Sequence, residues 1–148
     1  MEVGNPENPN NQEAQIKNLF DRSHALVFSK APTTSKKLSI SCPVPDENSV
    51  DGVALFSLEY VPNKGSDRGL SQIRALYEVK EKFASDTPPA STLTELKFTR
   101  NHVVKCGIYK KEMIKGNAIL ELISTTTPDL NSLSELVGKA EAYYSNGK

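Results

Sequence analysis

The sequence predicts an α+β domain, an antiparallel sheet of about four to five strands covered on one face by two to three helices. Apolar and polar side chains alternate with a period of two over Gly52–Val61 and over much of Thr92–Ser124, as in half-buried strands. Apolar residues recur at helical spacing in three other places, which supply the helices. A chain of 148 residues is the usual size of one domain and buries a core without disulfide bonds.

The first segment, Met1–Gln12, is dominated by Asn, Pro and Glu and predicts a disordered arm ahead of a single domain over residues 13–148. A helix is expected to begin at Glu13 and to fade near Ser23. Its apolar positions at i, i+3 and i+4 are Ile16, Leu19 and Phe20. The apolar run Ala25–Phe28 then predicts a short buried strand.

Two strands and a helix are expected next. Alternation predicts a short strand at Leu38–Cys42, which Pro43 ends because proline donates no hydrogen bond to a sheet. A second strand covers Gly52–Val61. Leu70–Ala84 is predicted to be helical because its apolar residues recur at helical spacing. The charged residues that lie four apart on the opposite side are Arg74, Glu78 and Lys82.

The stretch Thr92–Ser124 predicts the centre of the sheet, with an apolar face under the helices and a lysine-rich face open to solvent. Turns are expected at Asn101-His102 and at Lys115-Gly116-Asn117. The expected apolar face consists of Leu96, Phe98, Val104, Cys106, Ile108, Ala118, Leu120 and Leu122.

The last element is a helix that starts at the capping box Ser132-x-x-Glu135 and stops near Asn146-Gly147. Its apolar stripe is Leu133, Leu136, Val137, Ala140, Tyr143 and Tyr144. The two tyrosines are candidate interface residues, since tyrosine is favoured at interfaces; alternatively they cover the edge of the core. From Gly52 onward, the order of elements fits a circularly shifted ferredoxin-like sheet and other antiparallel α+β sheets equally well.

The charge is distributed unevenly. The chain is neutral, with 18 basic and 18 acidic residues, but Lys97–Lys115 holds six basic residues against one acidic residue. Phosphate backbones attract such a region because bound Lys and Arg release counterions, and an aromatic ring on the same face can stack on a base. The alternative is that these lysines only solvate the sheet and guard its edges. The predicted polyanion-binding residues are Lys97, Arg100, Lys105, Tyr109, Lys110, Lys111 and Lys115.

The sequence gives little support for a catalytic site or a metal site. His102 and Cys106 are four residues apart on a predicted strand, about 13 Å at ~3.3 Å per residue, which is beyond the reach of a nucleophile and its base. Two histidines and two cysteines without C-x-x-C or H-x-x-x-H spacing predict no metal site, and no motif indicates a cofactor. The remaining route to an enzyme is a convergence of carboxylates, for which the candidates are Asp51, Glu59 and Glu121.

The start of the chain has no basic region followed by an apolar core, so it does not predict a signal peptide. No apolar run approaches the ~20 residues of a membrane span. Two cysteines cannot form a disulfide framework and suggest reduced thiols. We therefore expect an intracellular protein located in the cytoplasm.

Together these features predict a non-enzymatic structural or interaction protein that self-associates into a homo-oligomer. Its basic sheet region would bind a polyanion or an acidic protein surface. A small viral structural or accessory protein has this profile, and so have many cellular adaptors. The alternatives are a sequence-tolerant RNA- or DNA-binding protein and a small enzyme that uses converging carboxylates.

Overall fold

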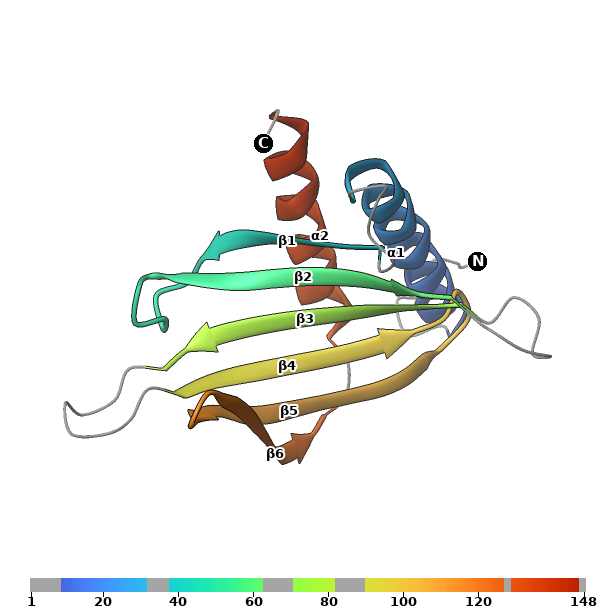
Figure 1. Ribbon diagram of the computed structural model, residues 1–148. Helices are drawn as coiled ribbons and strands as arrows, with labels where there is room; N and C mark the ends of the chain where they lie inside the picture. The colour runs from blue at the N-terminus through green and yellow to red at the C-terminus, as the bar shows by residue number, and fades with distance from the viewer. Residues whose placement is uncertain (1–8, 32–37, 63–70, 82–89, 127–128, 147–148) are drawn as a thin grey trace.

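In the described part of the chain, six strands form one antiparallel sheet, and two helices lie against one of its faces (Figure 1). The computed structural model describes residues 9–31, 38–62, 71–81, 90–126 and 129–146. The elements in chain order are α1 (Pro9–Lys30), β1 (Leu38–Pro45), β2 (Val53–Val61), β3 (Gln72–Lys80), β4 (Ala90–Phe98), β5 (Val103–Ile114), β6 (Asn117–Thr125) and α2 (Leu130–Ser145).

The strands lie in the sheet in the order in which they occur in the sequence, and each pairs antiparallel with the next. The α+β class is therefore confirmed, with six strands instead of four to five. Of the two alternatives, the structure excludes the ferredoxin-like order, because that order needs crossovers and this sheet is a simple meander.

The additional strand is β3, which occupies part of the segment that the helical spacing predicts as the helix Leu70–Ala84. Ile73, Ala75 and Val79 are buried, so the apolar period that the structure uses is two. Both periods fit this short segment, and pairing with the strands on either side decides between them. The charges spaced for a helix instead make cross-strand ion pairs, Arg74 with Glu59 and Glu95, and Glu78 with Lys111. Residue 70 and residues 82–84 of the predicted helix lie outside the described residues.

Helix α1 is continuous and longer than predicted at both ends. It begins at Pro9, inside the predicted arm, and runs through Ala25–Phe28, where the apolar run predicts a strand. The buried stripe continues beyond Ser23 to Leu26 and Val27. Ser23 itself occupies a buried position of that stripe, so a polar residue interrupts the pattern at the point where the prediction ends the helix. Residues 1–8 of the predicted arm lie outside the described residues.

Helix α2 begins slightly earlier than predicted. Asp129 is its N-cap and accepts a hydrogen bond from the backbone N–H of Ser132, so Ser132 is the third residue of the helix rather than its cap. The helix ends at Ser145, with Asn146 as its C-cap, close to the predicted stop. The predicted stripe is confirmed: Leu133, Val137 and Ala140 are buried, and Leu136, Tyr143 and Tyr144 are partly buried against the core. No helix in the described ranges has the length and apolar character to cross a membrane.

The helices cover one part of the sheet. Both pack on β1, α1 also packs on β2 and β3, and the two helices pack on each other. At the other end, all nine residues of β6 are exposed. Figure 1 shows β6 at the lower edge of the sheet, on the opposite side from β1. The stretch Thr92–Ser124 is extended as predicted, but it forms one end of the sheet and not its centre.

The predicted apolar face of this stretch is correct only for β4 and part of β5. Leu96, Phe98 and Cys106 face the core, whereas Val104 is exposed and Val103 packs on the core instead. A bulge between Lys97 and Phe98 shifts the register at this point, which changes the facing of the residues opposite. The register further places Leu120 and Leu122 opposite Lys111 and Tyr109, on the face away from the helices.

Two fully buried serines allow a matched test of the core. Ser23 and Ser49 both have 0% exposed surface, but the Ser23 hydroxyl has no hydrogen-bond partner among the described residues. The Ser49 hydroxyl donates to the carbonyl oxygen of Val53 and accepts from the N–H of Asp51. We expect Ser23→Ala to raise the free energy of unfolding by about 1 kcal/mol and Ser49→Ala to lower it by about 1–2 kcal/mol. Urea denaturation measures both, and a loss of stability in Ser23→Ala would contradict this expectation.

Candidate functional site

The predicted polyanion-binding residues lie on β4, β5 and the two turns that flank β5, but not on one face. The register places Lys97 opposite Lys105 and Tyr109 opposite Leu93, on the face away from the helices. Lys110 lies opposite Thr92, whose side of β4 faces the helices. Arg100 lies in the turn after β4, and Lys115 in the predicted turn between β5 and β6. The basic residues therefore lie on both faces of the sheet and in the turns at both ends of β5.

Most of these cations have acidic partners within the chain. The ion pairs are Arg100 Nε to Asp21 Oδ1 at 2.9 Å, Lys105 Nζ to Glu95 Oε1 at 3.2 Å, Lys110 Nζ to Glu112 Oε2 at 3.4 Å, and Lys111 Nζ to Glu78 Oε2 at 3.2 Å. Among the described residues, Lys97 and Lys115 have no acidic partner. A phosphate that binds the paired cations has to compete with these carboxylates, so the region attracts a polyanion less strongly than its composition suggests.

A row of alternating charges crosses the open face of the sheet from β2 to β5. Arg74 joins Glu59 at 3.2 Å and Glu95 at 2.6 Å, and Lys105 approaches the other oxygen of Glu95. Glu95 is only 5% exposed, although it lies on the face without helices, because the long side chains on either side cover it. Burial acts to raise its pKa, but the hydrogen bonds from Arg74 and Lys105 outweigh burial and hold the pKa below the usual 4.5.

The ring of Tyr109 contacts other side chains of the same chain. The Nζ atom of Lys105 lies 5.5 Å from the centroid of its ring, so the prediction that the two side chains share a face is confirmed. A side chain at Gly107 would come within 3.2 Å of Leu122 and 3.4 Å of Tyr109. The glycine thus lets both side chains lie close over β5, and Tyr109 links the charged row to the apolar side chains of β6.

Tyr143 and Tyr144 join α2 to the edge of the sheet. Their rings contact each other edge to face, with centroids 4.9 Å apart, and both are partly buried against the core. The hydroxyl of Tyr144 donates to the backbone carbonyl of Ser41 on β1. These contacts favour the alternative in which the two tyrosines cover the edge of the core over the alternative in which they bind another protein.

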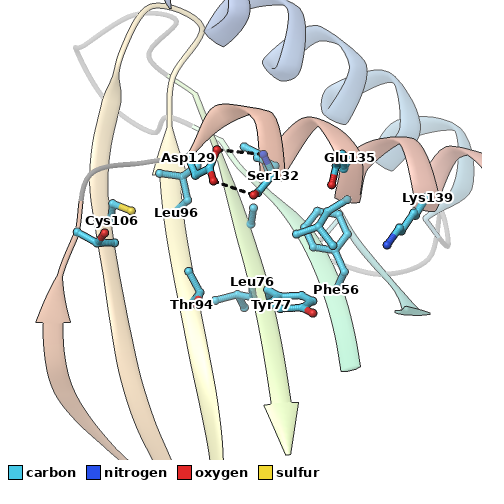
Figure 2. Close-up of a pocket in the computed structure, with 14 residues that line it drawn as sticks. Phe56, Leu76, Tyr77, Thr94, Leu96, Cys106, Asp129, Ser132, Glu135 and Lys139 are labelled. Atoms are coloured by element: carbon cyan, nitrogen blue, oxygen red, sulfur yellow. Dashed lines mark hydrogen bonds between the residues drawn. The ribbon is translucent and has the colours of Figure 1, made fainter. Parts of the chain in front are cut away.

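A pocket of about 380 Å³ opens between the first turns of α2 and strands β2 to β5 (Figure 2). Phe56, Leu96 and Cys106 form part of its floor, and Ser132, Glu135 and Lys139 stand on the helix above it. Asp129 at its rim is held by two hydrogen bonds from Ser132, which lower the pKa of its carboxyl. Tyr77 donates to Asp46, and burial together with this bond raises the pKa of its phenol to about 12. Asp129, Ser132 and Tyr77 are thus held by hydrogen bonds within the chain, which is a structural role.

The candidate carboxylates do not converge. Asp51 lies in the turn before β2 and pairs with Lys80, while Glu59 lies on β2 and Glu121 on β6. Four strand spacings separate the last two, about 19 Å at ~4.8 Å each. Cys106 is half-buried, and burial raises the pKa of its thiol, which makes it a poor nucleophile. No group of three or more potential metal ligands occurs within the described part of the chain.

The surface that the sequence did not predict is the outer edge of β6, which has no paired strand in the part of the chain that the structure describes. Four large aliphatic side chains on this strand are half-exposed: Ile119 at 48%, Leu120 at 49%, Leu122 at 51% and Ile123 at 54%. Met113 and Ile114 extend the apolar surface at the tip of β5. The signal in the sequence is that nine residues of β6 contain one charge and no proline, although edge strands are normally guarded by such residues.

At the other edge, β1 carries the expected protection. Pro43 and Pro45 lie within this strand and remove two hydrogen-bond donors, and Tyr144 occupies the carbonyl of Ser41. The sheet therefore has one blocked edge and one edge that can accept another strand. This difference makes β6 the stronger candidate for a functional surface.

The charged row has a testable role in stability. Because the folded-state pKa of Glu95 is lowered, its ionised form contributes stability that is fully present above the unfolded-state pKa and is lost as the pH falls through the folded-state pKa. We expect Glu95→Gln to lower the free energy of unfolding at pH 7 by about 1–3 kcal/mol, and the difference from wild type to shrink towards pH 3. Denaturation at both pH values measures this effect. Lys80→Gln, which breaks the exposed pair with Asp51, is the control and should cost less than about 1 kcal/mol.

The pairing of the cations also predicts the strength of RNA binding. If only Lys97 and Lys115 contact phosphates, the slope of log K against log salt for single-stranded RNA is about −1.4, whereas six contacts would give about −4. Fluorescence anisotropy with labelled poly(U) at several salt concentrations measures this slope. Lys110→Glu with Lys111→Glu should leave the weak binding nearly unchanged. A steep slope that this double substitution abolishes would show that phosphate displaces the internal carboxylates.

Comparison with known proteins adds no functional assignment: no family model matches the chain, and neither a curated protein nor a solved structure matches it.

Proposed function

We propose that this protein is a non-enzymatic interaction protein that self-associates through the open end of its sheet, formed by β6 and the tip of β5. The observation that carries the proposal is the outer edge of β6, which pairs with no strand among the described residues and has four aliphatic side chains about half-exposed beside it. A strand edge of this kind presents a row of unpaired N–H and C=O groups, which is a template for another strand.

Both backbone hydrogen bonds and buried side chains would contribute to the free energy of association. Each main-chain hydrogen bond made at the edge exchanges water for a protein partner and contributes modestly, about 0.5–1.5 kcal/mol. The burial of aliphatic surface contributes more, at about 25 cal/mol per Å². A net charge of zero over the whole chain adds little repulsion between copies.

Binding of a polyanion or of an acidic protein surface by the basic region is the less supported alternative. Four of its six cations already have carboxylate partners, and the seven predicted residues do not share one face. Binding to an acidic partner would have to break those pairs or use Lys97 and Lys115 alone.

The test is the molecular mass in solution. We expect wild-type protein to show concentration-dependent association by size-exclusion chromatography with light scattering, and Leu120→Lys to shift it to the monomer, because a charge at the edge opposes strand pairing. The association should persist at high salt, since it buries aliphatic surface and involves few ions.

The matched control is Leu55→Lys on β2, where the side chain is 43% exposed but the strand is paired on both sides, with β1 and β3, and lies four strands from β6. Its mass distribution should equal that of wild type. Circular dichroism verifies that both variants remain folded. A wild-type chain that is monomeric at all concentrations, or an equal loss of association in both variants, would overturn the proposal.

A further inference from the structure

Strand β6 has a sequence that is symmetric about its own centre. The strand runs from Asn117 to Thr125, so its middle residue is Glu121. The five central residues read Ile-Leu-Glu-Leu-Ile in both directions. Beyond them, Ala118 mirrors Ser124, which is also small, and the polar Asn117 mirrors the polar Thr125.

Resting on the self-association proposed above, we infer that two copies of the chain pair their β6 strands antiparallel across a two-fold axis at Glu121, which joins two six-stranded sheets into one continuous sheet. In a two-fold interface each contact occurs twice, residue i with j and j with i. In this register Ile119 meets Ile123 of the second copy, Leu120 meets Leu122, and each polar or small end residue meets its counterpart. Every residue of the strand then faces one of its own kind.

The charge at the axis is the least favourable feature of this register. The two copies of Glu121 lie opposite each other, and like charges directly opposite destabilise a strand pair. Lys110 is the neighbour of Glu121 on β5, in direct register. The row across the axis therefore reads Lys110, Glu121, Glu121, Lys110, but each Lys110 is also paired with Glu112, so the lysines offset the two glutamates only in part. This leaves a modest repulsion at the centre of an otherwise matched interface.

The size of the contact sets its strength. Nine residues at ~3.4 Å give a seam about 31 Å long, with about eight to ten main-chain hydrogen bonds. With side chains on both faces of a single strand pair, the buried area falls below the ~1,200 Å² of a standard interface. We therefore expect a reversible dimer with a dissociation constant in the micromolar range.

The free edge carries one of the features that usually prevent pairing. A register shift between Ile108 and Tyr109 makes Ile123 an extra residue of β6, towards the end of the strand. Asn117–Leu122 pairs with β5 in an unbroken register, so the axis at Glu121 lies next to a regular segment. The two residues with positive φ beside this hairpin, Lys115 and Gly116, lie in the turn and not in the strand.

Cross-linking tests the register. In a parent carrying Cys106→Ala, we expect Glu121→Cys to form a covalent dimer with a short bis-maleimide at micromolar protein concentration, because residues opposite each other on paired strands have Cβ atoms about 5 Å apart. The remaining thiol, Cys42, is buried, and the parent itself controls for its reaction. Glu121 is exposed at the edge, so its replacement does not disturb the core.

Substitutions at the strand ends provide the matched control. Asn117→Cys alone should not cross-link, since the two copies of position 117 would be about 27 Å apart, eight residues at ~3.4 Å. A mixture of Asn117→Cys and Thr125→Cys should cross-link as a heterodimer. Efficient cross-linking of Asn117→Cys alone, or none at position 121, would overturn the register.

The outcomes separate the two proposals. A wild-type chain that associates and a Leu120→Lys variant that does not, together with no cross-link at position 121, would leave self-association standing and remove the two-fold pairing. A parent that is monomeric at all concentrations would remove both.

A charge substitution gives an independent check. Only this register sets two Glu121 carboxylates face to face, so Glu121→Gln should tighten the dimer by up to about five-fold. Glu13→Gln on the exposed side of α1 makes the same charge change away from the edge and should leave the dissociation constant unchanged. Analytical ultracentrifugation measures both, and weaker association in Glu121→Gln would contradict an axis at this residue.

Discussion

The extent of helical cover determines how this molecule presents its sheet. Two helices pack on β1, β2 and β3 and bury the apolar residues of those strands, whereas β6 extends beyond them and keeps none of its residues buried. A sheet of six strands in meander order has two edges, and the chain treats them differently. The edge at β1 contains two prolines and a hydrogen bond from α2, whereas β6 contains no proline and its outer edge receives no such bond from the described residues. The apolar surface that the helices cannot reach is therefore also the surface with free backbone groups.

The charges reinforce this division. Arg74, Glu95 and Lys105 bind one another across three strands, so the middle of the open face is closed to outside ions by its own pairs. The row ends at Tyr109, where Gly107 leaves room for Leu122. From there to the edge the side chains are aliphatic. Between β5 and β6, the open face changes from charged side chains that pair with one another to exposed aliphatic side chains. An exposed apolar surface bordered by polar residues is typical of a site that binds another polypeptide.

The elements whose patterns agree with their surroundings were predictable. Helix α2, the strand Val53–Val61 and both turns beside β5 follow from periodicity and turn residues alone. The failures are at Ser23, where a buried hydroxyl interrupts the stripe of α1, and at β3, where helix-forming residues lie in a strand. In β3 the partners of Arg74 and Glu78 come from other strands, and no local pattern contains that information.

The sequence by itself determined the α+β class, the extended character of Thr92–Ser124 and the concentration of lysines within it. Only the tertiary structure decided which of those lysines are free and which side of each strand is covered. The reason is that ion pairing and burial depend on residues distant in the chain: Arg100 meets Asp21, Lys111 meets Glu78, and the helices end their cover before β6. A strand edge is likewise a property of the assembled sheet, so β6 emerges as a candidate interface only once its neighbours are in place.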